Sequence, residues 1–197
     1  MNVAFNFRQT SGYVTDVGVE SPVLNEAYPT TYANGATAGW ESTYVDPYRD
    51  RDNSIDRRLA GHNRVGYVSA PVDRDFRCDL DAAGAMDLHL AVGDPLFGYA
   101  TNQVNPYAKF VDTSSVLFTV VAGDTSIAAG EFYDATGVKR TSPADWVANQ
   151  AVKSLTFSTT ILRMRISAIT AGEHTPLTHL AVATAAGGST LWAQSLM

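Results

Sequence analysis

The chain has 197 residues, of which 45% are hydrophobic and 17% are charged, and its formal net charge is -6. This length and apolar content suit one globular domain with a real core. The negative charge argues against a protein that holds nucleic acid by general attraction, because such proteins carry a basic face. No apolar run approaches the ~18 residues of a membrane span, which argues against a membrane protein.

The first residues predict a strand and no secretion signal. In "VAFNF", the apolar residues Val3, Phe5 and Phe7 alternate with smaller or polar ones. The start "MNVAFNFRQT" lacks a basic stretch followed by a long apolar run, so we expect no signal peptide. Residues 8–56 are loop-rich, and a long loop region in a compact domain indicates function or wrapping.

Both signs of charge crowd into "DPYRDRDNSIDRRLAG", residues 46–61. One interpretation is a binding site, since arginine and carboxylate groups suit sugar hydroxyls and protein partners. The polar residues of this site are Arg51, Asp52, Arg57 and Asn63. The alternative is a set of salt bridges that holds a long loop on the domain. The sequence leaves both interpretations open.

Aromatic residues on expected loops give a second set of candidates. Trp40, Tyr48 and Trp146 are suited to stack on a sugar ring or to anchor a protein contact. The alternative is that these rings cover the end of the core.

The later segments alternate with the period of strands, in "FRCDL", "MDLHLAV", "ILRMRI" and "THLAVAT". The pattern places Cys78 inward as a small apolar residue, and a single cysteine allows no intrachain disulfide. His89 and His179 fall opposite the apolar faces, so we expect them to be partly exposed. The residues expected to share one core are Phe5, Phe76, Leu88, Leu90, Leu155, Phe157, Leu162, Met164 and Leu180.

One segment predicts a helix. In "SPADWVANQ", Ser142 suits the N-cap, Pro143 the first helical position and Asp145 the first turn. The many short strands elsewhere, separated by turn residues, are typical of an antiparallel β-sandwich or barrel.

The C-terminal stretch 185–197 forms a separate element. Two glycines break the chain after the last expected strand, and "LWAQSLM" then follows without a charged side chain. Apolar side chains gain free energy by burial, so we expect this tail to dock on its own domain or on a neighbouring subunit. The subunit-contact residues are Leu191, Trp192, Leu196 and Met197.

Taken together, "FNF", "SGYVTD", "FRCDLDAAGAMDLHLAVGD", "ADWVAN" and "THLAV" resemble the galactose-binding-like β-sandwich modules. This group includes malectin-like and many carbohydrate-binding modules. The typical strand–turn–strand ending in Leu-Gly-Asp has Val92 in the leucine position here. The resemblance implies an all-β antiparallel sandwich of the jelly-roll kind, with one short helix and long N-terminal loops. It covers residues 3 to about 184, so we expect one domain over 1–184 and the tail beyond it.

Nothing in the sequence marks a catalytic or metal centre. There is no GxSxG, no HExxH and no phosphate-binding glycine loop, so we expect a protein without catalytic activity and without a cofactor. Calcium stays open through the resemblance alone, because Asp46, Asp50 and Asp52 do not form an EF-hand loop.

Free-standing domains with this resemblance occur among tailed-phage virion proteins. The resemblance therefore implies a structural or accessory protein of a virion, such as a capsid decoration, head–tail or tail component made in the host cytoplasm. Its expected partners are other virion proteins, further copies of itself and host polysaccharide, and neither nucleic acid nor a membrane. The alternative is a stand-alone carbohydrate-binding module without a virion role.

Overall fold

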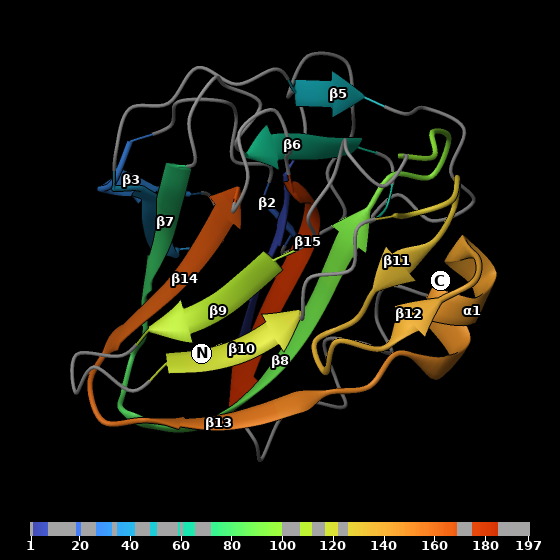
Figure 1. The fold of residues 1–197 in the computed structure, drawn as a ribbon. Helices are drawn as coiled ribbons and strands as arrows, with labels where there is room; N and C mark the ends of the chain where they lie inside the picture. Colours follow the sequence, from blue (N-terminus) through green and yellow to red (C-terminus); the bar gives the residue numbers. More distant parts are fainter. Residues whose placement is uncertain are drawn as a thin grey trace.

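A computed structural model of the chain describes residues 2–7, 19–20, 27–32, 35–41, 48–50, 59, 61–65, 72–99, 107–111, 117–121, 126–168 and 175–184. Strands in these residues form two sheets, the larger sheet and the smaller sheet, which pack over a shared core (Figure 1). The all-β sandwich expected from the sequence is confirmed. The tail 185–197 lies outside the described residues.

The larger sheet is built around the antiparallel pair of its two longest strands, β8 and β15, in which Leu90 is opposite Leu180. Strand β1 lies on the far side of β15, and β13 and β11 lie on the other edge of β8. Its described strands are β1 (Asn2–Asn6), β2 (Val19–Glu20), β5 (Tyr48–Asp50), β6 (Gly61–Val65), β8 (Gly84–Gly93), β11 (Phe132–Tyr133), β12 (Lys139–Arg140), β13 (Lys153–Phe157) and β15 (Thr175–Thr184).

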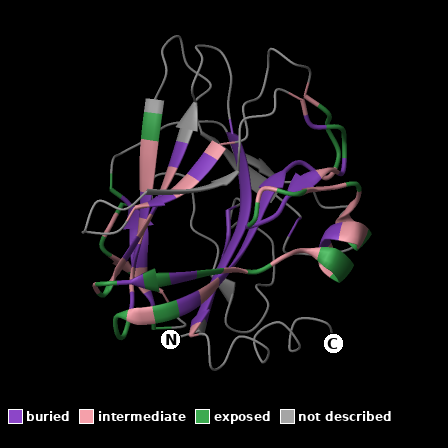
Figure 2. Cartoon of the chain, turned by 60° about the horizontal axis from the view of Figure 1, so that its bottom comes forward, coloured by how far each residue is buried: buried purple, intermediate pink, exposed green. Residues whose placement is uncertain are grey.

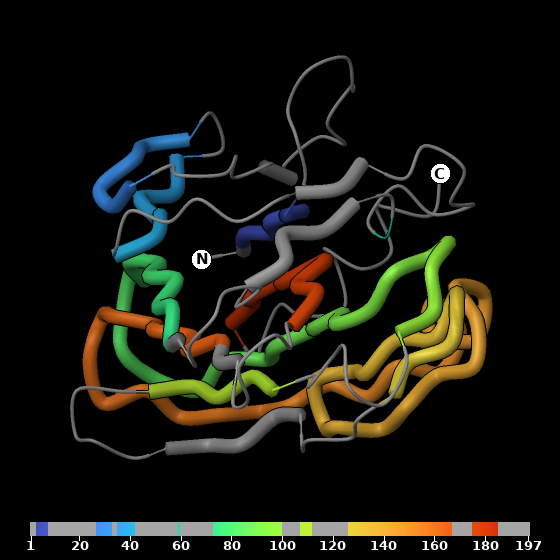
Figure 3. The backbone as a smooth tube through the Cα atoms, turned by 45° about the horizontal axis from the view of Figure 1, so that its top comes forward, coloured from blue at the N-terminus to red at the C-terminus, as the bar shows by residue number. Residues whose placement is uncertain are grey.

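The smaller sheet brings together strands that are far apart in the sequence. Strands β7 and β14 run antiparallel over their full length, with Phe76 opposite Met164. In Figure 3, the tubes of β4, β7 and β14 follow one another across this sheet. In spatial order its described strands are β10 (Leu117–Val121), β9 (Tyr107–Val111), β14 (Ile161–Ala168), β7 (Val72–Asp79), β4 (Thr37–Trp40) and β3 (Thr30–Thr31).

The core lies between the facing surfaces of the two sheets. Its aromatic centre joins both sheets, because Phe5 of β1 and Phe7 just after β1 each pack edge-on against Phe76 of β7, at centroid distances of 5.1 and 5.0 Å. All nine residues that the alternation assigns to the core are buried in this cluster. That part of the sequence interpretation is confirmed.

Two features of the fold differ from the simple pattern. The stretch 8–56 contains β3 and β4 as part of the smaller sheet, so it is not only loop. Along β8 from Leu88 to Gly93, and along β15 from Thr175 to Ala183, residues of both faces are buried rather than those of one (Figure 2). A strand covered on both sides needs an element over its outer face, and helix α1 (Pro143–Asn149) is such an element.

Helix α1 forms as the sequence predicts. Ser142 caps it, since its hydroxyl accepts a hydrogen bond from the backbone N–H of Asp145 at 3.0 Å. Pro143 occupies the first turn, and Trp146 is the helix residue that is buried. Among the described residues, no helix combines the length and the apolar character that crossing a membrane demands.

Candidate functional site

Most of the charge on the smaller sheet lies on the face that points away from the core. Because side chains alternate along a strand, β7 and β14 bury Phe76, Cys78, Leu162 and Met164 and turn their charged neighbours outward. We call this surface the charged face. It consists of Tyr28, Glu41, Asp73, Asp75, Arg77, Asp79, Tyr107, Lys109, Arg163 and Arg165.

Arg165 occupies the middle of the charged face. Its Nε and Nη2 donate to the two oxygens of Asp75 on the neighbouring strand, both at 2.7 Å. Its Nη1 lies 3.4 Å from Asp73. A guanidinium held on two sides by carboxylates has a fixed orientation, so this arginine is positioned in advance of any ligand.

Glu41 connects two further arginines. Arg163 donates to it through Nε and Nη2, the latter at 2.7 Å, and Arg77 lies 3.8 Å from the same carboxylate. The interaction with Glu41 raises the pKa of Arg163, so that side chain stays charged at every physiological pH. The hydrogen bonds to Glu41 use only some of the N–H donors of Arg163, so the others can donate to a ligand.

Tyr28 adds an aromatic ring to the charged face. The guanidinium of Arg77 lies 4.1 Å from the centre of this ring, and the tyrosine hydroxyl donates to Asp79 at 2.8 Å. The hydrogen bond to Asp79 raises the pKa of Tyr28, which therefore remains a neutral donor.

Gly39 makes room for this arrangement. It has φ +149, and a Cβ at this position would lie 2.6 Å from the backbone nitrogen of Tyr28. The segment that carries Tyr28 can approach β4 this closely only because no side chain intervenes.

The charged face is neutral as a whole. Four cations, Arg77, Lys109, Arg163 and Arg165, are balanced by four carboxylates, Glu41, Asp73, Asp75 and Asp79. Within the described part of the chain, no three His, Cys, Asp or Glu side chains gather as metal ligands would. The chemistry this surface offers is a fixed array of hydrogen-bond donors and acceptors beside an aromatic ring.

Part of the outer face of the larger sheet is covered by α1 instead. Trp146 is fully buried, donates its indole N–H to the carbonyl of Leu90 at 3.0 Å and packs edge-on against His179. Below it, His179 contacts the side-chain oxygen of Asn6 through Nδ1 at 2.6 Å. The part of this face around Leu90 and His179 therefore belongs to the interior.

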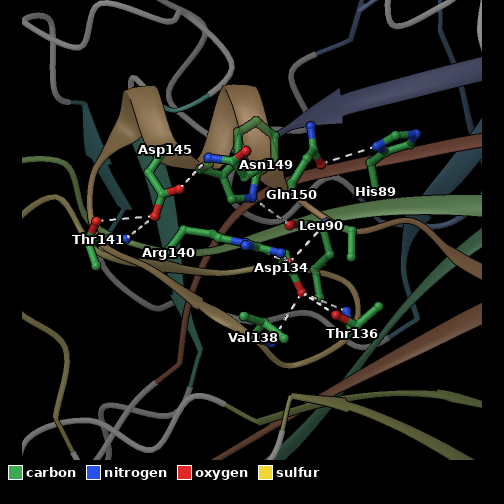
Figure 4. A network of polar contacts seen from close by, with 12 residues as sticks. His89, Leu90, Asp134, Thr136, Val138, Arg140, Thr141, Asp145, Asn149 and Gln150 are labelled. Carbon is green, nitrogen blue, oxygen red and sulfur yellow. Dashed lines mark hydrogen bonds and ion pairs between the residues drawn. The ribbon is translucent and has the colours of Figure 1, made fainter.

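Asp134 fastens the helix region to the sheet (Figure 4). Its buried carboxylate accepts from Arg140 at 2.6 Å, from the backbone and hydroxyl of Thr136, and from the backbone of Val138 and Ala151. Burial favours the protonated form, but these hydrogen bonds outweigh it and hold the pKa of Asp134 below its ordinary value. The network is fully engaged within the protein and serves structure.

The candidate residues of the sequence interpretation fall into separate groups. Trp40 and Trp146 are both in the interior, at 3% and 0% exposure, so neither ring presents a face to a sugar in this structure. Their burial matches the alternative, in which the rings cover the core. Tyr48 and Asn63 are register partners in the β5–β6 pair, and only their backbones are described.

The remaining candidates lie outside the described residues, and their roles stay predictions. They are Arg51, Asp52 and Arg57 of the charge-rich stretch and Leu191, Trp192, Leu196 and Met197 of the tail.

Two expectations about single residues had opposite outcomes. His89 and His179 are buried rather than partly exposed, because α1 covers the strand face on which they lie; His89 contacts Gln150 just beyond the helix at 3.1 Å. Cys78 is buried as expected, and burial raises the pKa of its thiol to about 12.

The charged face itself was not assigned from the sequence, although a signal for it exists. The alternation in "FRCDL" and "ILRMRI" already turns Arg77, Asp79, Arg163 and Arg165 outward. What the sequence does not show is that β7 and β14 are neighbours, since they lie more than 80 residues apart.

Comparison with known proteins rests on structure alone. No protein-family model and no curated protein matches the chain. Among solved structures, the protein YxiM from Bacillus subtilis matches with a TM-score of 0.50 and 12% identity, over 93% of this chain and 40% of that one. The chain therefore spans less than half of YxiM, and the likeness concerns the fold.

Carbohydrate-binding modules are also among the structural neighbours. A family 35 module from Cellvibrio japonicus matches with a TM-score of 0.36 and 14% identity, over 75% of this chain and 93% of that one. A family 32 module from C. perfringens, solved with galactose, matches with a TM-score of 0.28 and 15% identity, over 72% of this chain and 93% of that one.

Proposed function

We propose that the chain is a non-catalytic binding module and that the charged face of its smaller sheet binds polysaccharide. The observation that carries this proposal is the partly exposed, pre-oriented array formed by Tyr28, Glu41, Arg77, Arg163 and Arg165. A carbohydrate-binding-module-like fold supports it.

The chemistry of the face suits sugars. Vicinal hydroxyls of a sugar both donate and accept, so they match a surface on which carboxylate and guanidinium groups alternate. Mutual pairing holds side chains such as Arg165 and Asp75 in place, which lowers the entropy that ordering them on a ligand costs. A tyrosine ring at the edge adds an apolar surface for the sugar carbons.

The competing explanation is that these ion pairs only stabilise the sheet. Exposed pairs contribute little to folding, about 0–1 kcal/mol each. The two explanations therefore predict different results for removal of one pair: a structural role changes stability alone, and a binding role changes retention on polysaccharide with little change in stability.

The test uses affinity gel electrophoresis against a panel of neutral and acidic soluble polysaccharides. The double substitution Glu41→Gln and Arg163→Gln removes a neutral pair and keeps the size of the Glu41 side chain. We expect the wild type to be retarded by at least one polysaccharide, and the double variant to bind it about tenfold or more weakly.

A matched control changes an exposed polar pair on the larger sheet. Ser154 donates to Asp87 at 2.5 Å, and the variant Ser154→Ala with Asp87→Asn leaves the charged face intact. Equal loss in both variants, or no retardation of the wild type by any polysaccharide, would overturn the proposal.

A second candidate function, assembly into a virion, has its own supporting feature. Phe97 and Leu96 are 54% and 40% exposed on a turn that is held rigid by the buried carboxylate of Asp94, which accepts from both of their backbone N–H groups at 3.2 and 2.9 Å. Rigid exposed apolar side chains favour protein contacts.

For this second role we propose that the turn contacts another copy of the chain within a phage particle. Mass spectrometry of purified intact particles tests the location, and sedimentation of Phe97→Ser beside the wild type tests the contact. Absence from particles, or equal self-association of the two proteins, argues against it.

A further inference from the structure

One cation of the charged face differs from the other three. Arg77, Arg163 and Arg165 each have a carboxylate within 4.0 Å, whereas no described carboxylate pairs with the ammonium of Lys109. Its printed contact is with an aromatic ring, because Nζ lies 5.3 Å from the ring centre of Tyr107 on the same strand. Both side chains are half-buried.

The surroundings of Lys109 favour an anion. It is the register partner of Arg165 on β14, so two cations are directly opposite each other across strands. Like charges in this position repel, and Arg165 already engages Asp75 and Asp73. A negative group placed beside Lys109 would relieve the repulsion and add a charge-assisted hydrogen bond.

The position also fits a ligand that continues from the Tyr28 end of the face. Strand β14 lies between β7, which carries Arg77, and β9, which carries Lys109 (Figure 1). Two strand spacings amount to about 10 Å. One extended polysaccharide chain can therefore contact both ends, with an aromatic ring next to a cation at each.

We propose that Lys109 and Tyr107 form a subsite for a negatively charged substituent of the bound polysaccharide, either a carboxylate or a sulfate ester. This inference rests on the proposed function and adds a substrate class to it. Lys109 donates to the anionic group, and Tyr107 packs against the sugar that carries it.

The overall charge of the protein opposes the approach of acidic polysaccharides. A net charge of -6 repels polyanions at long range. At physiological salt such repulsion is screened beyond about 8 Å, so a preference for an acidic polysaccharide then reports on local contacts.

The experiment compares polysaccharides that share a backbone and differ in charge. Polygalacturonate is paired with highly methyl-esterified pectin, and dextran sulfate with dextran, so that the first pair reports on carboxylates and the second on sulfates. We expect the wild type to bind the charged member of at least one pair about tenfold more tightly than the neutral member.

The variants assign that preference to a residue. Lys109→Gln is expected to bind both members of the pair equally, and Lys109→Arg to retain the preference. Lys153→Gln, on β13 of the larger sheet, removes a lysine outside the charged face and is expected to behave as the wild type.

Each result has one meaning. Equal binding of charged and neutral members by the wild type overturns the subsite and leaves the polysaccharide function standing. A preference that survives in Lys109→Gln overturns the assignment to this residue. Failure of the wild type to bind any neutral or acidic polysaccharide overturns the proposed function, and the subsite with it.

Discussion

The two outward faces of the sandwich consist of similar strands, but they differ in how far their side chains are buried. On the smaller sheet, every second residue of β9 and β14 remains partly exposed, and these positions carry the charged face. On the larger sheet, most of the corresponding positions of β8 and β15 are buried, and His89 and His179 lie beneath α1 and its buried Trp146.

The difference shows that the presence of a covering element determines which residue types a strand face can carry. Charged residues tolerate an uncovered face, where they pair with one another near water. A covered face needs apolar side chains, or polar ones with internal partners such as Asn6 for His179. The uncovered face is thus the one that has polar groups to offer to a ligand.

Removal of the Trp146 indole, by which α1 covers the larger sheet, should have the largest effect on stability. Trp146→Ala deletes a fully buried indole and is expected to destabilise the protein by about 3–5 kcal/mol. Trp146→Phe keeps most of the volume and loses the hydrogen bond to Leu90, so it should cost about 1–3 kcal/mol. Urea denaturation measures both changes in the free energy of unfolding. If Trp146→Ala cost less than Trp146→Phe, the indole would not be part of the core.

The Asp134 network should make the covered side sensitive to acid. Its folded pKa lies below the ordinary value of 3.8, so the unfolded chain takes up a proton first as the pH falls. Stability contributed by Asp134 is therefore complete well above pH 3.8 and is lost as the pH falls through the lower folded pKa.

Substitution of Asp134 tests this account. Asp134→Asn should lose about 1.5–3 kcal/mol at neutral pH and show a flatter decline of stability below pH 3.8 than the wild type. The exposed Asp81→Asn is the control. Parallel pH profiles for the wild type and Asp134→Asn would contradict the account.

A side chain at position 39 should affect both the stability of the protein and the geometry of the charged face. Gly39→Ala meets a positive φ and a contact of 2.6 Å with the backbone of Tyr28, and we expect a cost of about 1–3 kcal/mol with displacement of the Tyr28 ring from Arg77. Gly84→Ala has a similar φ of +141 but open space around its Cβ. Weaker polysaccharide binding in Gly39→Ala alone is the expected result, and equal binding in both variants speaks against the placement of Tyr28.

The smallest change in stability is expected on the charged face itself. Glu41→Gln with Arg163→Gln should alter the free energy of unfolding by about 0–1 kcal/mol, because the pair is partly solvated. A larger loss in a urea melt would mean that the charged face is structural after all.

The sequence predicts those parts of the fold that depend on local pattern. Alternation places Leu162 and Met164 in the core, and Ser142 with Pro143 begins α1. The same alternation is wrong for His89 and His179, because these residues are covered by a helix that lies at least 30 residues away in the sequence.

The candidate site was harder to predict for a related reason. Each strand of the charged face shows outward charges by itself, but the contact of Arg163 with Glu41 joins residues 122 positions apart. The contact between Tyr28 and Arg77 further depends on the absence of a side chain at Gly39. A single sequence carries no signal for such pairings. The stretch 46–61 became the candidate site because its charge density is visible in the sequence.

The most direct test of the central claim is to map the ligand on the protein by NMR. Addition of the polysaccharide that is most strongly retained in the gel assay should shift the backbone amide signals of 73–79 and 161–166, in β7 and β14, and leave those of 86–92 in β8 unchanged. Shifts confined to 48–50 and 61–65, which lie within and next to the charge-rich stretch, or to β8, would contradict the assignment of binding to the charged face.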